Sequence, residues 1–317
     1  MNYFIKNKDR ILNVLHISGL FLLVVLTIFG VYQIRGENFT EIKKLVLSRW
    51  GFFLIACPLR LLDWVLDYYL WRCVLRKYSS GIPFMKSVWI YLSQGAGVIL
   101  PAQLGRALRS YVLTKTTDVS ISKAIIIEIF YLLCVGVGAF LVIFTSLGFY
   151  AHSFVLPIML CLLMLLFFPY LLKVLKPLLS KWNIYLSDES LNPYFIILLC
   201  IGCSMGWAIN GLIFYLLLGG KESGLYLSQV QMIILGNLFI ATCSGIPGGM
   251  GLIETTIGVS LHWLHVQLPE IILVIALFRV ITFWIWIPVG WFALIKLKLY
   301  KEINLIRKTD TYDKEVS

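Results

Sequence analysis

The sequence predicts an all-α polytopic membrane protein with about six full transmembrane helices and two re-entrant helix pairs. Composition is the first indication: the 317 residues are 60% hydrophobic and 14% charged, whereas a soluble domain is about half apolar and about a quarter charged. Spacing is the second, because the apolar residues form runs of about 20, enough to cross a hydrocarbon core about 30 Å thick. The mean hydropathy of +0.88 agrees with both.

The distribution of basic residues excludes another class of protein. A net charge of +11 would indicate a nucleic-acid binder in a soluble chain, but here most Lys and Arg residues lie between apolar runs. That arrangement sets membrane topology, so no nucleic-acid partner is expected. Cysteines are scattered over apolar segments, and the Cys200-x-x-Cys203 spacing lacks further soft ligands. We therefore expect no disulfide framework, no metal and no cofactor.

Full spans are predicted wherever an apolar run is long enough and unbroken. The first follows basic residues, as a secretory signal does, but it is too long and has no small-residue cleavage site, so it is retained. The others are bounded by charged, proline or polar residues. The predicted spans cover residues 11–33, 50–75, 123–149, 153–175, 193–218 and 270–295.

Two further apolar stretches, 83–113 and 228–265, are broken centrally by proline and glycine. Both are predicted to be re-entrant helix pairs, which occur at membrane depth where protein or a water-filled cavity satisfies the broken backbone. Treating either one as a single crossing would place the basic tail or the basic 173–181 loop outside. The positive-inside rule therefore favours cytoplasmic termini.

An internal repeat follows from this topology. The segment 101–105, Pro-Ala-Gln-Leu-Gly, matches 247–251, Pro-Gly-Gly-Met-Gly, and each copy lies between two predicted spans. An odd number of crossings separates the copies, so the second is inverted relative to the first, as in many secondary transporters. One transmembrane domain is expected over 1–306, with repeats over about 50–149 and 193–295 and a polar cytoplasmic tail over 307–317.

The second break carries the most informative motif. After Pro247, residues Gly248, Gly249 and Gly251 allow a tight backbone whose N–H groups face a ligand oxygen. The alternative is a turn that only lets two half-helices cross at small residues. Glu254 follows one turn later, and an ionisable residue at membrane depth is a functional candidate.

The first break carries basic residues instead. After the structural breaks at Pro101 and Gly105, the guanidinium groups of Arg106 and Arg109 lie three residues apart on nearly one helix face. Arginine can bind phosphate oxygens through two nitrogens. The alternative is that both side chains extend to the cytoplasmic interface as topology anchors.

Charged residues within the spans complete the set of candidates. Arg60, Asp63 and Asp67 share one helix face, which predicts either a structural ion pair or a proton-coupling or gating role. Glu128 and Arg279 hold equivalent positions in the spans that follow the two breaks, so both are expected to face the cavity.

Taken together, these motifs resemble the lysylphosphatidylglycerol synthetase transmembrane-region family of flippase-like membrane proteins. The family has a proline-x-x-leucine-glycine-glutamate-x-x-arginine segment, similar to 101–109, and a proline-glycine-glycine-x-glycine-x-x-glutamate segment, which 247–254 matches. Other family positions match Glu128, Arg279, Pro288 and Gly290. Two departures are evident: Arg106 replaces the glutamate, and Ile129 and Leu132 replace an arginine and an aspartate.

The resemblance implies a lipid flippase or transporter. Its cargo would be an anionic or aminoacylated phospholipid, or a polyprenyl-phosphate-linked intermediate, bound by Arg106, Arg109, Glu128, the glycines 248, 249 and 251, Glu254 and Arg279. Arg106 favours a phosphate over a cationic headgroup. The alternatives are an enzyme or membrane subunit of envelope-lipid modification, or a scaffold for a separate lipid synthase or glycosyltransferase. Aminoacyl transfer is not expected without the soluble catalytic domain of longer members, and a homo-oligomer is an open alternative.

Overall fold

The computed structural model describes residues 39–79, 81–97, 104–181, 187, 189–244, 249 and 251–299. Over these residues the regular structure is helical, and no strand is present. The predicted span 11–33 and the tail 307–317 lie outside the described residues. So do Pro101, Pro247 and Gly248 at the two breaks.

The helices follow the predicted order of spans and breaks. In chain order they are α3 Phe39–Tyr78, α4 Phe84–Leu92, η1 Ser93–Gly97, α5 Leu104–Thr116, α6 Ile121–Ala151, α7 Val155–Lys181, α8 Pro193–Leu217, η2 Gly220–Ser223, α9 Leu227–Ser244, α10 Leu252–Trp263, α11 Leu268–Arg279, η4 Val280–Trp284 and α12 Trp286–Lys296.

Within the described residues, four helices are long and apolar enough to cross a membrane: Ile121–Ala151, Val155–Pro177, Pro193–Leu217 and Leu268–Lys296. They coincide with four of the predicted spans, which confirms the all-α membrane fold class. The predicted span 50–75 lies within α3, which begins earlier, at Phe39. Arg49, which the sequence analysis would leave between spans, is therefore on the helix.

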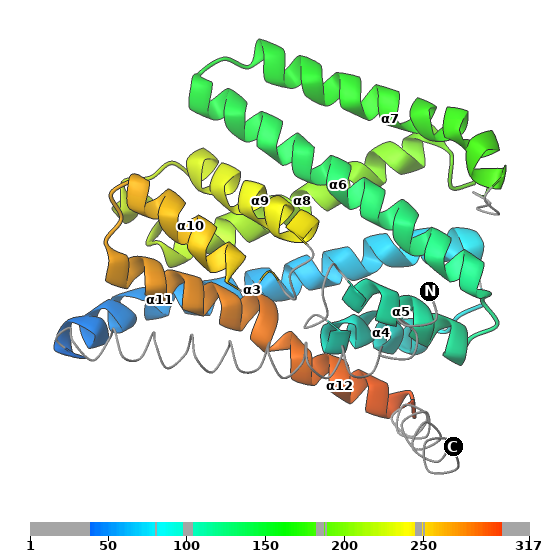
Figure 1. Ribbon diagram of the computed structural model, residues 1–317, viewed down its shortest axis with the longest axis horizontal. Helices are drawn as coiled ribbons and strands as arrows, with labels where there is room; N and C mark the ends of the chain where they lie inside the picture. Colours follow the sequence, from blue (N-terminus) through cyan, green and yellow to red (C-terminus); the bar gives the residue numbers. More distant parts are fainter. Residues whose placement is uncertain are drawn as a thin grey trace, which may run out of the picture.

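Each predicted break separates helices that are shorter than the long spans, the longest of them being α9 with 18 residues. The helices around the first break are α4, η1 and α5, and those around the second break are α9 and α10. At nine residues, α4 is about 14 Å long, less than half the thickness of a hydrocarbon core. The two pairs lie toward opposite ends of α3 (Figure 1).

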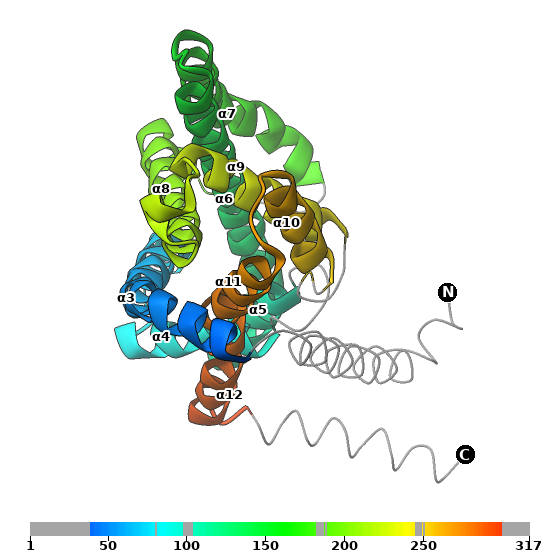
Figure 2. The same cartoon turned by 90° about the vertical axis from the view of Figure 1, so that its left-hand side faces the viewer.

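Local signals set the helix ends around the long spans. Asn192 caps α8 by accepting a hydrogen bond from the N–H of Tyr194 at 3.0 Å, and Pro193 occupies the first turn. His152 ends α6 in a left-handed conformation with φ 50°, so the chain turns directly into α7. The two helices then lie side by side, with α7 outermost (Figure 2).

The core forms two groups of buried side chains on either side of the bundle centre. Trp71, Ile90 and Phe130 belong to the group around the C-terminal half of α3 and α4 to α6. Phe214 and Val274 belong to the group around α8 to α11. Many apolar side chains of α7 remain exposed, as expected for a helix that faces lipid.

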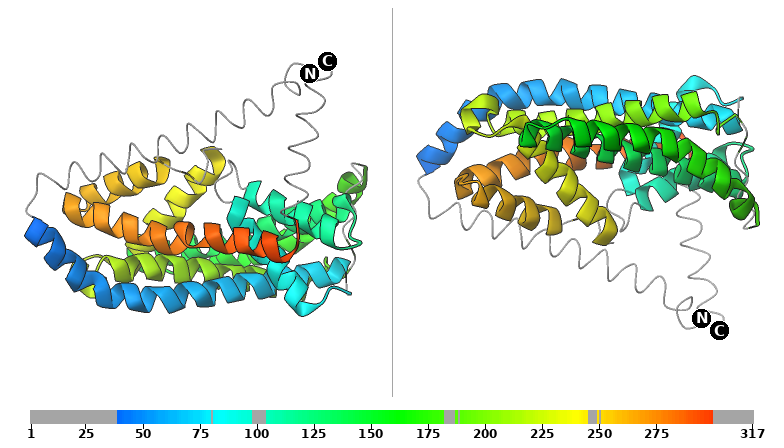
Figure 3. Two further views of the ribbon diagram at one scale, coloured as in Figure 1. Left: turned by 90° about the horizontal axis from the view of Figure 1, so that it is seen from below. Right: turned by 90° about the horizontal axis from the view of Figure 1, so that it is seen from above.

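Glycines bring η1 and α12 into backbone contact. A Cβ atom added at Gly290 would lie 2.0 Å from the backbone nitrogen of Ala96, and one at Gly95 would lie 2.2 Å from the carbonyl oxygen of Trp286. Only glycine fits at such a distance. The first broken segment is thereby held against the last span, and α11, η4 and α12 follow one another along the molecule (Figure 3).

Candidate functional site

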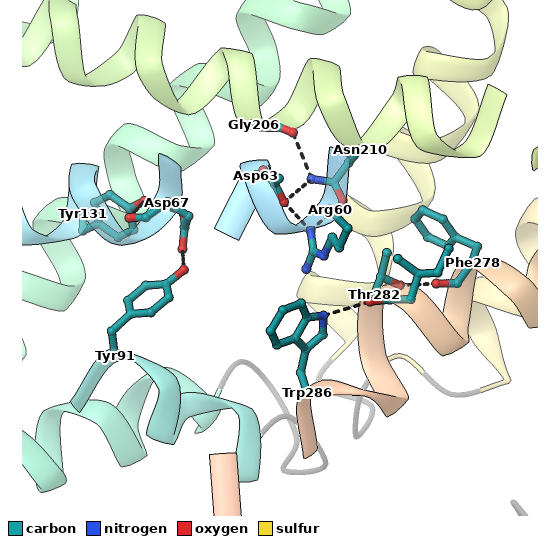
Figure 4. A network of polar contacts seen from close by, with 11 residues as sticks. Arg60, Asp63, Asp67, Tyr91, Tyr131, Gly206, Asn210, Phe278, Thr282 and Trp286 are labelled. Atoms are coloured by element: carbon teal, nitrogen blue, oxygen red, sulfur yellow. Dashed lines mark hydrogen bonds and ion pairs between the residues drawn. The ribbon is translucent and has the colours of Figure 1, made fainter. Parts of the chain in front are cut away.

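A polar stripe runs along one face of α3. Arg60, Asp63, Asp67 and Trp71 are three or four residues apart, so their side chains emerge on the same side of the helix. Together they make hydrogen bonds to three neighbouring helices, α4, α6 and α8 (Figure 4 shows the first three residues). In a bundle of apolar helices, polar residues of this kind face the interior or a water-filled cavity.

The first group in the stripe joins α3 to α8. Arg60 forms an ion pair with Asp63, and its Nη1 atom donates to Asn210 Oδ1 at 2.9 Å. Asn210 Nδ2 in turn donates to Asp63 at 3.1 Å and to the carbonyl of Gly206 at 2.9 Å. The Nε atom of Arg60 is buried and has no partner in the described part of the chain. The local ion pair is therefore present, and an amide of α8 supports it.

Asp67 has different partners. Its carboxylate accepts hydrogen bonds from the hydroxyl groups of Tyr91 on α4 and Tyr131 on α6. No Lys or Arg of the described chain lies within ion-pair distance of it. Asp67 therefore connects three helices through neutral donors and does not share Arg60 with Asp63.

The stripe ends at a buried ion pair between α5 and α6. Arg109 Nε donates to Glu128 Oε1 at 2.8 Å, and Arg109 Nη2 pairs with Glu128 Oε2. Trp71 Nε1 donates to the same Oε1 atom at 2.9 Å, and the Arg109 guanidinium lies 4.8 Å from the Trp71 ring centroid. Arg109 has no exposed surface, so it does not extend to the membrane interface.

Both arginines of α5 keep a nitrogen without a partner. The Nη1 atoms of Arg106 and Arg109 are buried, and neither has a hydrogen-bond partner in the described structure. The Arg106 guanidinium lies 5.6 Å from the Tyr131 ring centroid, and that of Arg109 lies 5.9 Å from it. Buried unsatisfied donors are rare, and each of these two arginines therefore keeps one unused hydrogen-bond donor.

The second break is held by Glu254 and Arg279. Glu254 Oε2 accepts from the N–H of Gly251 at 2.7 Å, and Glu254 Oε1 accepts from Arg279 Nε at 2.7 Å. Arg279 Nη2 donates to the carbonyl of Gly249 at 3.3 Å. Gly249 and Gly251 have φ angles of 62° and 80°, as a tight turn requires. The N–H of Gly251 is thus bound to Glu254 and does not face a ligand directly.

The two ion pairs have equivalent positions with the charges exchanged. In the first, the arginine is on the short helix after the break and the glutamate is on the helix that follows. In the second, the short helix α10 carries Glu254 and the following helix α11 carries Arg279. The second pair is more open, with 35% of the Glu254 side chain exposed compared with 10% for Glu128.

The profile of a known family, described as the lysylphosphatidylglycerol synthase TM region, matches residues 14–290. The chain belongs to this family. The resemblance drawn from the sequence motifs is confirmed, and no curated protein matches the sequence. Membership of the lysylphosphatidylglycerol synthase TM-region family, together with the apolar helices, indicates a multi-pass membrane protein related to lipid modification or transport.

In this member of the lysylphosphatidylglycerol synthase TM-region family, a π-helical turn follows Arg279. The N–H of Ile285 bonds to the carbonyl of Val280 at 3.2 Å, five residues back, and Trp286 Nε1 donates to the carbonyl of Ile281 at 2.8 Å. Trp286 stacks on Trp64 of α3, with ring centroids 3.4 Å apart. Such turns are frequent at functional sites. This one aligns α12 with the polar stripe (Figure 4).

Several site residues are not found by reasoning from the sequence. Tyr91, Tyr131 and Trp71 bind the predicted carboxylates, but tyrosine and tryptophan are common in apolar helices and give no separate signal. Asn210 had a usable signal, because an amide inside an apolar run needs a partner. Over the described residues, no group of three or more His, Cys, Asp or Glu side chains could hold a metal ion.

Proposed function

We propose that the chain is a lipid transporter that moves phospholipid headgroups across the cytoplasmic membrane of a prokaryote. The observation that carries this proposal is the pair of charge-exchanged ion pairs, Arg109–Glu128 and Glu254–Arg279, one beside each broken segment. Ionised side chains in a membrane interior are expensive, and they are usually found where an ionic substrate passes. Family membership supports a role with lipids.

The proposed architecture is an inverted repeat of about six spans and two re-entrant pairs, with both termini in the cytoplasm. The positions of α4–α5 and α9–α10 toward opposite ends of α3 support this arrangement (Figure 1). So does the placement of the two ion pairs, because at each break the short helix carries one member of the pair and the following helix carries the other. In such transporters broken helices meet the substrate near the midplane.

The preferred cargo is a lipid with a phosphate in its headgroup, including a polyprenyl phosphate. The unpartnered Nη1 atoms of Arg106 and Arg109 support a phosphate site beside Tyr131 on the cytoplasmic side. Arg279 would receive the phosphate at the other break, and displacement of Glu254 would free the N–H of Gly251 for it. The acyl chains would remain in the bilayer while the headgroup crosses the polar interior.

Exchange of ion-pair partners gives this route a mechanism. A lipid phosphate competes with Glu128 for Arg109, and with Glu254 for Arg279, so binding loosens the contact between α5 and α6 or between α10 and α11. Each loosened contact permits one repeat to move against the other. Arg60, Asp63 and Asp67 link α3 to α4, α6 and α8, and they would gate this movement.

The test is transfer of a fluorescent phosphatidylglycerol between leaflets in proteoliposomes, read by quenching from outside. Arg109→Ala and Glu254→Gln are expected to slow transfer at least about tenfold, because each removes a charged group that the phosphate meets. Lys115→Gln on α5 and Glu222→Gln on η2 are matched controls, since both side chains are exposed, and they should keep the wild-type rate. Equal rates in all variants, or no transfer by the wild type, would contradict the proposal and favour a scaffold for a separate synthase.

A further inference from the structure

A second arginine of α3, Arg72, lies outside the polar stripe and faces α4. Its Nη1 atom donates to the Tyr68 hydroxyl at 2.6 Å and to Ser87 Oγ at 3.0 Å. The guanidinium also lies 4.6 Å from the centroid of the Phe84 ring. These contacts fix the guanidinium in one orientation beside the first turn of α4.

Among the described residues, the charge of Arg72 has no anionic partner. The side chain is more than nine-tenths buried, yet no Asp or Glu of the described chain lies within ion-pair distance. Its Nε and Nη2 atoms have no hydrogen-bond partner in the described structure, and neither is sealed from solvent. Buried arginines are usually paired with a carboxylate or phosphate. Two oriented donors are thus left for an anion.

The start of α4 adds further donors beside them. The helix begins at Phe84 after Pro83, with no side-chain cap and no acidic residue in its first turn. The first N–H groups of a helix have no partner within the helix and favour negative charge. Lys86 lies in the same turn, where its positive charge is repelled by the positive end of the helix dipole. A bound anion would compensate this repulsion.

The surroundings identify the kind of anion. Tyr69, Phe84 and Met85 are 50%, 46% and 58% exposed. The Tyr69 and Phe84 rings lie 6.5 Å apart and Phe84 contacts the guanidinium, so exposed apolar side chains border it. One turn later α3 ends with the basic residues Arg76 and Lys77. An apolar surface, then an oriented arginine, then a basic helix end is the order of acyl chains, phosphate and water at a bilayer face.

We propose that Arg72, Ser87 and the first turn of α4 form a binding site for the phosphate of an anionic membrane phospholipid. Its acyl chains lie on Tyr69, Phe84 and Met85. This site is distinct from the transport route, because Arg72 contacts Tyr68, Phe84 and Ser87 and makes no hydrogen bond to the polar stripe in the described structure. It acts on the route nonetheless: Ser87 and Tyr91 are one turn apart on α4, and Tyr91 binds Asp67. A bound lipid would therefore fix α4 against the polar stripe.

Native mass spectrometry of the detergent-solubilised full chain tests the site by titration with phosphatidylglycerol and with diacylglycerol of the same acyl chains. Arg72→Gln is expected to weaken phosphatidylglycerol binding about fivefold or more and to leave diacylglycerol binding unchanged. Arg76→Gln removes the same charge one turn away from an exposed position and should stay close to the wild type. Equal binding by Arg72→Gln and the wild type would overturn the proposal, as would an equal loss for both lipids.

A competition with inorganic phosphate distinguishes the source of the anion. Retention of phosphatidylglycerol at high phosphate supports a lipid site, whereas displacement at equal concentration would assign the site to a free anion. If Arg72→Gln does not fold, wild-type protein is irradiated with a phosphatidylglycerol that carries a photoreactive acyl chain. Cross-links to Tyr69, Phe84 or Met85 are expected. Their absence, or the capture of a protein at these residues instead, would overturn the proposal.

Discussion

Arg109 binds Glu128 through two guanidinium nitrogens while a third, Nη1, stays buried without a partner in the described structure. Glu128 also accepts from Trp71, so one carboxylate joins α3, α5 and α6. The pair is thus both a structural connection and an incompletely satisfied cation. That combination suits a position where a substrate oxygen binds.

Removal of one member of this pair should destabilise the protein strongly. Arg109→Gln or Glu128→Gln leaves an uncompensated buried charge, which is expected to lower the free energy of unfolding by about 3–5 kcal/mol. The double variant should be more stable than either single one, because both charges are gone. Thermal unfolding in detergent measures the three values. Additive losses in the double variant would show that the two residues are not coupled.

Glu254→Gln should separate stability from transport. The side chain is partly exposed, and its loss is expected to lower unfolding free energy by only about 1–2 kcal/mol while transfer falls much further. Unfolding in detergent and lipid transfer in liposomes are both measured on protein from the same purification. Proportional losses in both would show that Glu254 only supports the Gly249–Gly251 turn.

The two tyrosines that bind Asp67 should act together. Tyr91→Phe and Tyr131→Phe each remove one hydroxyl donor and should each lower stability by about 1 kcal/mol. Because they share one acceptor, the double variant should deviate from the sum of the single effects. Tyr111→Phe on α5 is the control and should be close to neutral. An additive double variant would mean that Asp67 does not couple α4 to α6.

The contact between η1 and α12 should not tolerate a methyl group at Gly290. Gly290→Ala would place its Cβ 2.0 Å from the Ala96 nitrogen, so we expect a loss of about 3 kcal/mol or more and a change in transfer rate. Gly136→Ala on α6 meets nothing within 4 Å and should stabilise the helix by about 1 kcal/mol. The melting temperatures of the two variants test the expected loss and the expected gain of stability. A Gly290→Ala variant as stable as the wild type would refute the close contact between η1 and α12.

Much of the fold could be predicted from the sequence because apolar length and charge position are local properties. The spans 123–149 and 193–218 match α6 and α8 within a few residues, and both breaks fall where proline and glycine interrupt the runs. The start of α3 was less predictable. Lys43 and Lys44 suggest a loop, yet lysine is a good helix former, and the helix continues through them.

The site was predictable only in part, because the sequence gives the position of a residue on its own helix but not its partner on another. Sequence spacing places Arg60, Asp63 and Asp67 on one face, but it does not decide which partner each one finds. Asp63 takes Arg60, whereas Asp67 takes two tyrosines from helices that come later in the chain. Partners of that kind depend on how helices pack, and neither tyrosine is marked by charge.

The exchange of charges between the two breaks has an electrical consequence. Within each ion pair one cation faces one anion, so neither pair carries a net charge, and Arg106 adds one positive charge beside the first pair. An anionic lipid would carry its own charge across the bilayer, and the membrane potential would act on it at about 2.3 kcal/mol per 100 mV. A potential that is negative inside would then promote outward movement of anionic lipids, oppose that of cationic ones and leave zwitterionic ones unaffected.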